Sequence, residues 1–202
     1  MSLQLTKNIW AVGRNYVAHA KEMNAVIPEK PLIFLKSGNC LNPSSIIKLP
    51  TWSNEIHYEL EIAFRLDESL SFSHVSLALD LTARDAQKNA KNNGEPWTLA
   101  KSFNGACPIG SWISISDIAD INTLNFKLIK NKNLVQHGQA QDMIFKPLAL
   151  LSYVKNHFPL SAYDILITGT PDGVGPLASG DILEAQLSDD QQLLLTCHWD
   201  VI

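Results

Sequence analysis

Residues 54–66 read NEIHYELEIAFRL, and they carry the clearest structural pattern in the chain. Apolar side chains occupy every second position in the middle of this stretch: Tyr58, Leu60, Ile62 and Phe64. Such alternation is typical of a β-strand that buries one face in the core. The stretch therefore predicts a half-buried strand and a fold based on β-sheet.

The same alternation places Glu59 and Glu61 together on the other face of the strand. Glutamate is a poor strand former, and two like charges at neighbouring positions on one face repel each other. The pair is tolerated if that face is in water, which is the commoner case, or if a cation lies between the carboxylates. Two residues along a strand span about 6.6 Å, so both side chains can reach one ion.

Asp80 favours the cation. It interrupts the apolar residues 75–81, VSLALDL, which predict a buried strand. A buried carboxylate is unfavourable unless it is paired with a positive charge or binds a metal ion. Three carboxylates without clustered Cys or His suit a hard ion such as Mg²⁺ better than zinc. From these patterns, a divalent-metal site at Glu59, Glu61 and Asp80 and a pair of solvated glutamates both stay open.

The other segments of the chain are mostly short and strand-like, with glycines, prolines and polar residues between them. Helical patterns occur at residues 15–23, 82–94 and 147–158, and the second of these ends at a glycine. Asn15 and Thr82 are the predicted N-caps of the first two helices. Many strands without regular βαβ alternation predict a mixed α+β fold that is predominantly β, arranged as a barrel or sandwich.

Composition is typical of an ordinary soluble globular protein. The 202 residues, 46% hydrophobic and 18% charged, suit one domain, and we expect residues 1–202 to form it. A formal net charge of −4 gives no reason to expect nucleic acid or a membrane surface as a partner. Cys40, Cys107 and Cys197 are scattered and odd in number, which predicts free thiols in a reducing compartment. The first ten residues have no signal-peptide pattern, so the sequence predicts a cytoplasmic location.

Two further segments offer groups that could act on a substrate. His19 and Glu22 are three residues apart, so on a helix they share a face, and the carboxylate can orient the imidazole as a general base. A surface ion pair is the alternative.

Lys101 lies in the apolar stretch WTLAKSF, where a buried ammonium needs an anionic partner, although a lysine that extends its amine to solvent is commoner. The glycine-rich residues 168–175, TGTPDGVG, lack the Lys-Ser/Thr of a phosphate-binding loop and predict a turn that faces the substrate.

Five segments of the chain form a recognisable set: GRNYVAHAKE (13–22), HYELEIAF (57–64), LDLTARDAQ (79–87), PWTLAKSFNGACPIG (96–110) and ITGTPDGVGPLASGD (167–181). In this order they resemble the fumarylacetoacetate hydrolase family, especially its small single-domain acylpyruvase and oxaloacetate decarboxylase members. The resemblance covers about residues 9–187, nearly the whole chain. The chain departs from the family pattern at residues 67–76, a short segment without the helix and Gly-Tyr pair that relatives usually have there.

The resemblance implies the fold, the assembly and the residues of the site. The fold would be a mixed β-barrel or roll with a few short helices, and the protein would be a homodimer. By the same resemblance, the metal ligands for Mg²⁺ or Mn²⁺ would be Glu59, Glu61 and Asp80. The catalytic residues would be His19 and Glu22, on a mobile N-terminal lid, together with Lys101. The substrate-binding residues would be Arg14, Arg84, Gln87 and Thr170.

The activity implied by the resemblance is Mg²⁺-dependent cleavage of a C–C bond in a small 2-oxo acid, such as an acylpyruvate or oxaloacetate. The reaction would pass through an enolate that the metal stabilises. Keto–enol tautomerisation or isomerisation of 2-oxo or 2-hydroxymuconate-type acids would use the same enolate and is the alternative. A non-catalytic metal-binding module would have no use for His19, Glu22 and Lys101, and a purely structural β-protein would have no reason for Asp80 in an apolar strand.

Overall fold

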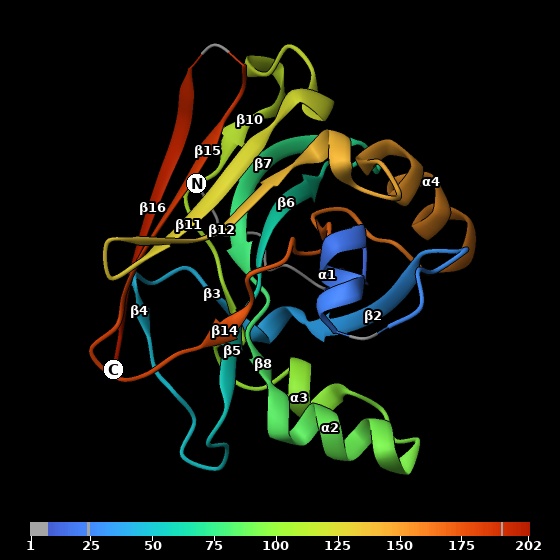
Figure 1. Ribbon diagram of the computed structural model, residues 1–202. Helices are drawn as coiled ribbons and strands as arrows, with labels where there is room; N and C mark the ends of the chain where they lie inside the picture. The colour runs from blue at the N-terminus through green and yellow to red at the C-terminus, as the bar shows by residue number, and fades with distance from the viewer. Residues whose placement is uncertain (1–7, 24, 191) are drawn as a thin grey trace.

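The computed structural model describes residues 8–23, 25–190 and 192–202. In these residues strands dominate, and the α-helices are α1 (Val17–Glu22), α2 (Arg84–Asn93), α3 (Thr98–Lys101) and α4 (Pro147–His157). Figure 1 shows α4 to one side of the central strands and α2 with α3 below them. The predicted class, a mixed α+β fold that is predominantly β, is therefore confirmed.

The larger sheet has six strands. In spatial order they are β10 (Ile113–Ser114), β7 (Phe72–Leu79), β6 (Leu60–Leu66), β13 (Ile165–Ile167), β1 (Asn8–Gly13) and β2 (Leu32–Ser37). β1 and β13 run parallel, and the other neighbours are antiparallel. The sheet is therefore mixed, as expected for a chain without βαβ repeats.

The second sheet has five strands, and two smaller sheets accompany the two large ones. Its strands in order are β12 (Asn133–Gln139), β11 (Asn125–Lys130), β15 (Ile182–Ser188), β16 (Leu193–Val201) and β4 (Ile46–Ile47). The smaller sheets are β14 (Gly175–Pro176), β5 (Ile56–Tyr58) and β8 (Thr82–Ala83), and the pair β3 (Leu41–Asn42) and β9 (Cys107–Pro108). Within the described residues neither large sheet closes on itself by hydrogen bonds, so the expected barrel or roll is a set of packed open sheets.

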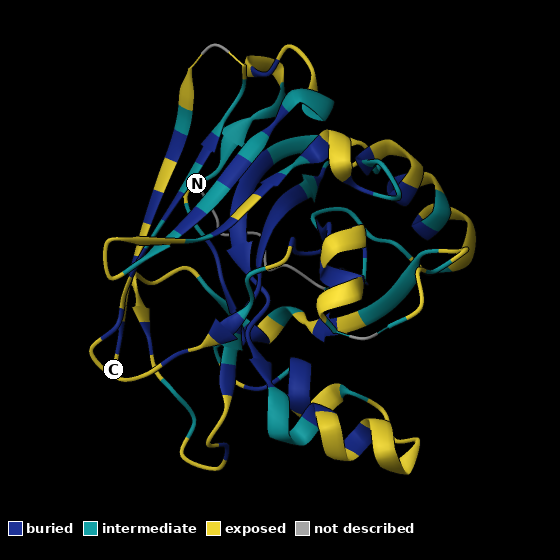
Figure 2. Cartoon of the chain, in the orientation of Figure 1, coloured by how far each residue is buried: buried dark blue, intermediate teal, exposed yellow. Residues whose placement is uncertain are grey.

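The main core lies between the two large sheets, where β11 and β15 pack against β6 and β7. Its buried side chains come from both sheets and include Ile62, Phe64, Phe126 and Leu183. Burial of an apolar side chain of this size stabilises the fold by about 1.5–3 kcal/mol. Figure 2 shows this core as the dark blue strands in the middle of the molecule.

A second, smaller core lies under α4. β1 contributes to both cores, because Ile9 and Ala11 face the main core while Trp10 and Val12 face the smaller one. The buried side chains of the smaller core are Trp10, Val12, Leu66, Leu150, Leu151, Val154 and Leu166. The helix predicted at residues 147–158 thus covers the outer face of the six-stranded sheet with its apolar side.

Residues 54–66 form two strands, β5 and β6, instead of one. The chain changes partner at Glu59: β5 pairs with β8 and β14, and β6 pairs with β7 and β13. The Glu59 carbonyl accepts a hydrogen bond from the Asp80 N–H at 2.8 Å. This bond connects the point where the chain passes from β5 to β6 with the residue that follows β7. The alternating apolar side chains are all buried, as predicted.

The predicted N-cap Asn15 is wrong. α1 begins after Tyr16, and no side chain caps it. Asn15 is buried and forms tertiary hydrogen bonds, from its Nδ2 to the carbonyls of Phe145 and Thr168 and from the Phe145 N–H to its Oδ1. The side chain therefore joins the start of the chain to the segment before α4 and to the end of β13.

The predicted N-cap Thr82 is also wrong, whereas the predicted end of the helix is confirmed. Thr82 belongs to β8, and α2 begins after Ala83 without a side-chain cap. The Thr82 hydroxyl donates to the Asp80 carbonyl at 3.0 Å. Gly94 ends α2 in the left-handed conformation, with φ of 69°.

The three cysteines are buried and free, as predicted. In the described part of the chain no helix is both long enough and apolar enough to span a membrane.

Candidate metal centre and active-site cleft

The pairing of β6 with β7 brings three carboxylates together. Leu60 lies opposite Leu79 in this antiparallel pair, so Glu59 faces Asp80 across the end of the ladder, and Glu61 lies two residues farther on the same side. One oxygen from each carboxylate lies within 4.8 Å of the others. Glu59 is 5% exposed, and Glu61 and Asp80 are each 1% exposed. The alternative of two solvated glutamates is therefore wrong.

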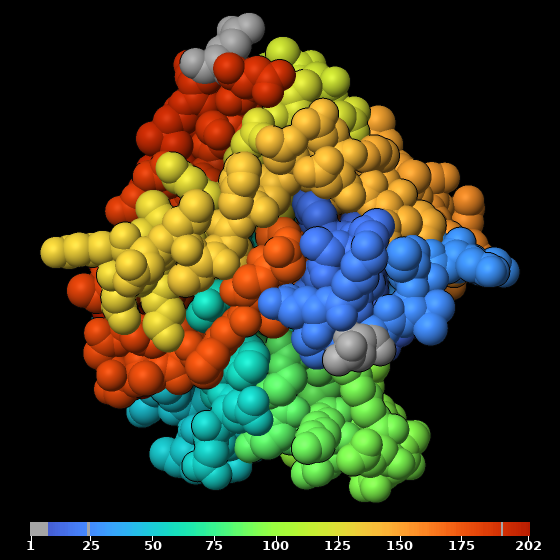
Figure 3. Space-filling model, viewed as in Figure 1, coloured from blue at the N-terminus to red at the C-terminus, as the bar shows by residue number. Residues whose placement is uncertain are grey.

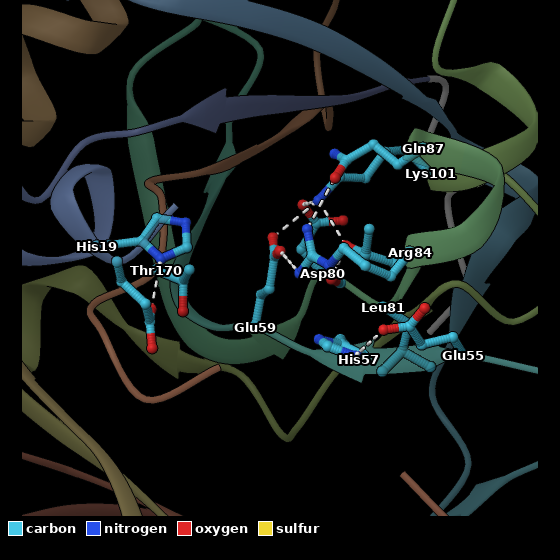
Figure 4. Close-up of polar contacts among 12 residues, drawn as sticks. His19, Glu55, His57, Glu59, Asp80, Leu81, Arg84, Gln87, Lys101 and Thr170 are labelled. Atoms are coloured by element: carbon cyan, nitrogen blue, oxygen red, sulfur yellow. Dashed lines mark hydrogen bonds and ion pairs between the residues drawn. The ribbon is translucent and has the colours of Figure 1, made fainter. Parts of the chain in front are cut away.

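Three cationic side chains contact two of these carboxylates, and Figure 4 labels two of the three, Lys101 and Arg84. Lys101 Nζ lies 2.8 Å from Glu59 Oε2 and 2.6 Å from Asp80 Oδ2. Lys36 Nζ lies 2.6 Å from Asp80 Oδ1, and Arg84 Nη2 lies 2.5 Å from Glu59 Oε1. Both lysines are buried, so these ion pairs are shielded from water and salt.

The ion pairs favour the charged forms of Glu59 and Lys101 despite burial. Burial alone would raise the pKa of Glu59, yet the Lys101 ammonium and the Arg84 guanidinium hold it far below its ordinary value. Burial alone would lower the pKa of Lys101, yet the Asp80 and Glu59 carboxylates raise it. Opposite charges at hydrogen-bond distance outweigh desolvation for both groups.

Glu61 has a different environment. In the described part of the chain, no cationic side chain lies within 4.0 Å of it, and its Oε2 accepts a hydrogen bond from the Gly169 N–H at 2.6 Å. Burial raises the pKa of Glu61 well above its ordinary value, and the charges of Asp80 and Glu59 raise it further. A positive ion between the three carboxylates would remove this repulsion. The all-oxygen donor set fits a hard divalent ion such as Mg²⁺ or Mn²⁺.

The backbone at Gly169 is specific for glycine. Its φ is 92°, and a Cβ there would lie 2.7 Å from Asn15 Cβ and 3.1 Å from the Val12 carbonyl oxygen. Gly169 lies two residues after the end of β13, and its N–H donates to Glu61 Oε2. The glycine-rich stretch therefore serves to bring the backbone close to the triad, in keeping with its predicted place beside the substrate.

His19 and Glu22 lie on α1, which packs beside the glycine-rich stretch. His19 is buried, and its Nδ1 lies 3.2 Å from Glu22 Oε2. Glu22 Oε1 in turn accepts a hydrogen bond from the Gly173 N–H at 3.1 Å. Figure 3 shows this contact from outside, with the blue N-terminal segment against the orange segment around residue 173. Because Nδ1 is held by Glu22, Nε2 is the ring nitrogen left for a substrate.

One cleft contains nine of the ten predicted site residues. They are Arg14, His19, Glu59, Glu61, Asp80, Arg84, Gln87, Lys101 and Thr170. Glu22, the tenth, reaches the cleft through His19. The cleft encloses a cavity of about 50 Å³. Arg84 is fixed further by Gln87, whose Oε1 accepts from its Nη1 at 2.8 Å.

Two buried residues that support this site were missed by the sequence analysis. Lys36 lies at the end of the apolar stretch PLIFLK, and a single lysine there gives no sign of its partner 44 residues away. Gln136 accepts from the Leu60 N–H through Oε1 and donates to Thr170 Oγ1 at 2.8 Å. It thereby connects the start of β6 to the glycine-rich stretch. In the sequence, Gln136 is one polar residue of a strand-like segment, and nothing there indicates that it is buried beside the site.

Comparison with known proteins agrees with this geometry. The family model for the fumarylacetoacetate (FAA) hydrolase C-terminal domain matches residues 8–195. Human mitochondrial oxaloacetate tautomerase FAHD1 is 38% identical over 190 residues, which cover 89% of this chain and 86% of the relative. A crystal structure from Oleispira antarctica matches with a TM-score of 0.93 and 38% identity, covering 98% of this chain and 94% of that one. Fumarylpyruvate hydrolase from Pseudomonas aeruginosa, in complex with Mn²⁺ and pyruvate, matches with a TM-score of 0.87 and 25% identity, covering 98% and 90%. The chain therefore belongs to the fumarylacetoacetate hydrolase family of enzymes.

Proposed function

We propose that this protein is a divalent-metal-dependent enzyme that tautomerises oxaloacetate or a closely related small 2-oxo acid. The observation that carries the proposal is the buried triad in the same cleft as His19, in which Glu61 pairs with no cationic side chain among the described residues. Among the activities that the sequence leaves open, tautomerisation is supported by relatives such as the human oxaloacetate tautomerase. We further propose Glu59, Glu61 and Asp80 as the metal ligands.

A bound Mg²⁺ or Mn²⁺ would supply positive charge where the substrate's carboxylate and 2-oxo oxygen bind, and so would favour loss of a neighbouring proton. The protein's own cations add to this field. Lys101 and Arg84 are fixed beside the triad by ion pairs, so they need no reorganisation when negative charge develops on the substrate.

His19 would move the proton. Its Nε2 would take a proton from C3 of the 2-oxo acid, and the resulting imidazolium would return that proton to the C2 oxygen, which completes the enol. Glu22 would stabilise the imidazolium that forms, because its carboxylate lies 3.2 Å from Nδ1. The reverse transfer would convert enol to keto acid by the same groups.

Cleavage of a C–C bond is the second candidate. It is supported by the fumarylpyruvate hydrolase of Pseudomonas aeruginosa, which matches almost the whole chain. For hydrolysis, His19 would deprotonate a water that attacks the distal carbonyl, whereas decarboxylation needs no such water. The same cleft residues would bind the substrate in both cases.

The experiment compares the reactions directly. Enol oxaloacetate is added to the enzyme in Mg²⁺, in Mn²⁺ or in EDTA, and both enol loss and pyruvate release are followed; pyruvate release from acetylpyruvate is measured in parallel. We expect metal-dependent enol loss that is faster than pyruvate release. Pyruvate release as the dominant reaction would favour C–C cleavage, and no turnover of either acid with either ion would refute both candidates.

A further inference from the structure

One face of α2 continues the cleft away from the triad. Arg84, Gln87 and Lys91 are spaced three and four residues apart, so they share a helical face, and all three line the cleft. With a rise of about 1.5 Å per residue, the backbone of Lys91 lies about 10 Å farther along the helix than that of Arg84. Arg84 contacts Glu59, whereas Lys91 is exposed to solvent. Lys91 therefore marks the outer end of the cleft.

An aromatic pair connects the inner and outer ends. The rings of Phe34 and Trp97 meet edge to face with centroids 5.8 Å apart, and both residues line the cleft. Lys101 Nζ lies 5.1 Å from the Phe34 centroid, and Lys91 Nζ lies 5.5 Å from the Trp97 centroid. Cation–π contacts thus hold one ammonium at each end of a single apolar wall.

The two ammonium groups differ in their partners. Lys101 is paired with Glu59 and Asp80, whereas Lys91 forms no ion pair with any carboxylate that the structure describes. The inner end therefore balances its own charge, and the outer end does not. An anionic group bound at the outer end would find a cation that is held in place but not neutralised.

Arg14 is a second cation of the cleft. It follows β1, lines the same cleft and, like Lys91, has no carboxylate partner within the residues described. Its φ of 59° is uncommon for a residue with a side chain. Partial burial of the Lys91 ammonium lowers its pKa, and repulsion from the positive charges of Arg84 and Arg14 lowers it further. A bound carboxylate would relieve that repulsion.

We propose that Lys91 and Arg14 form a subsite for the distal carboxylate of a short 2-oxo dicarboxylic acid whose 2-oxo end binds at the triad. The inference rests on the proposed function and deepens it, because it assigns dicarboxylate recognition to named residues. The Phe34–Trp97 wall would face the carbon chain between the two charged ends. An ammonium and a guanidinium are both strong hydrogen-bond donors to a carboxylate.

The test uses binding of two unreactive acids in the presence of Mg²⁺, measured by calorimetry. Malate and 2-hydroxybutanoate share the same 2-hydroxy acid end and the same number of carbons, but only malate has a distal carboxylate. In Lys91→Met we expect malate affinity to fall about 3- to 5-fold, the upper range for one partly exposed charge pair, and 2-hydroxybutanoate affinity to change less than about twofold. Lys91→Arg should retain most of the malate affinity.

Lys88→Met is the matched control, because Lys88 is an exposed lysine of α2 that does not line the cleft. Unchanged malate affinity in Lys91→Met, equal losses for both acids, or a wild type that does not prefer malate would each overturn the subsite. If the wild type tautomerises oxaloacetate and Lys91→Met keeps the wild-type affinity for malate, the subsite is refuted and the proposed function is not. A Lys91-dependent preference for malate in a protein without tautomerase activity would support the subsite and refute the proposed function.

Discussion

At the scale of single residues, the site depends on how each buried charge is balanced. Glu59 and Asp80 have lysine or arginine partners, while Glu61 receives one backbone N–H. Removing the charge of Glu61 should therefore have opposite effects on metal binding and on the stability of the metal-free protein.

We expect Glu61→Gln to weaken Mg²⁺ binding roughly 100-fold or more, because a hard ion that keeps several waters depends on each protein carboxylate. In EDTA the same variant should unfold with a free energy about 1 kcal/mol higher than wild type, since the amide removes like-charge repulsion and can still accept the Gly169 N–H. Calorimetry and denaturant unfolding measure the two effects. Glu95→Gln, at an exposed position, is the control, and wild-type Mg²⁺ affinity in Glu61→Gln would contradict the ligand assignment.

His19→Asn should separate proton transfer from metal binding. His19 makes no hydrogen bond to the triad in the structure described, so Mg²⁺ affinity should stay within about threefold of wild type, while enol conversion should slow by roughly 10²- to 10⁴-fold. Glu22→Gln should show a smaller loss, because it misorients the imidazole without removing it. The exposed His137→Asn is the control. Full activity in His19→Asn would show that another group moves the proton.

At the scale of elements, the glycine-rich stretch after β13 can be tested by comparing two glycines with the same backbone conformation. Gly169 and Gly180 have φ of 92° and 91°, but only Gly169 lacks room for a Cβ. Gly180→Ala should cost about 1 kcal/mol for the left-handed conformation alone. Gly169→Ala should cost more, about 2–4 kcal/mol, and should also weaken Mg²⁺ binding, because relief of the clash moves the N–H away from Glu61.

Denaturant unfolding and calorimetry on both glycine variants give the comparison. Equal losses of stability, with unchanged Mg²⁺ affinity in both, would show that the Gly169 N–H does not position Glu61.

Local sequence patterns predicted most elements but not their tertiary partners. The alternation through residues 54–66 continues in phase across Glu59, so nothing in it indicates that the chain changes sheets there. Asn15 and Thr82 have the chemistry of N-caps, yet tertiary contacts use their side chains instead. Lys36 could not be assigned because its partner Asp80 is brought to it only by the sheets.

At the scale of the whole molecule, metal binding should stabilise the fold, because the three carboxylates come together only where β6 pairs with β7. At a free Mg²⁺ concentration 100 times Kd, the gain is about 2.7 kcal/mol. For a domain of this length, that corresponds to a rise in Tm of about 5–10 °C. Thermal unfolding in Mg²⁺ and in EDTA measures it, with Asp80→Asn as the variant that should show no difference. A wild type with the same Tm in both buffers would rule out a site of this kind.

The resemblance in the sequence identified the family, and it named nine residues that lie in one cleft. It could do so because its five motifs contain the charged and polar side chains of the site. The sequence analysis did not single out Lys91, because in the sequence it has the pattern of an ordinary exposed lysine. The single domain over residues 1–202, the homodimer and the cytoplasmic location stay predictions.

The strand order of the six-stranded sheet also bears on how the protein is made. β13 lies between β1 and β6, and Ile9 pairs with Ile165. On a ribosome that adds 5–20 residues per second, β1 and β2 would wait roughly 6–30 s before β13 emerges to join them to β6. During that time the nascent chain holds two unfinished sheet edges, which are open to aggregation and to chaperones. The cleft is assembled late in translation, because its glycine-rich stretch is synthesised just after β13.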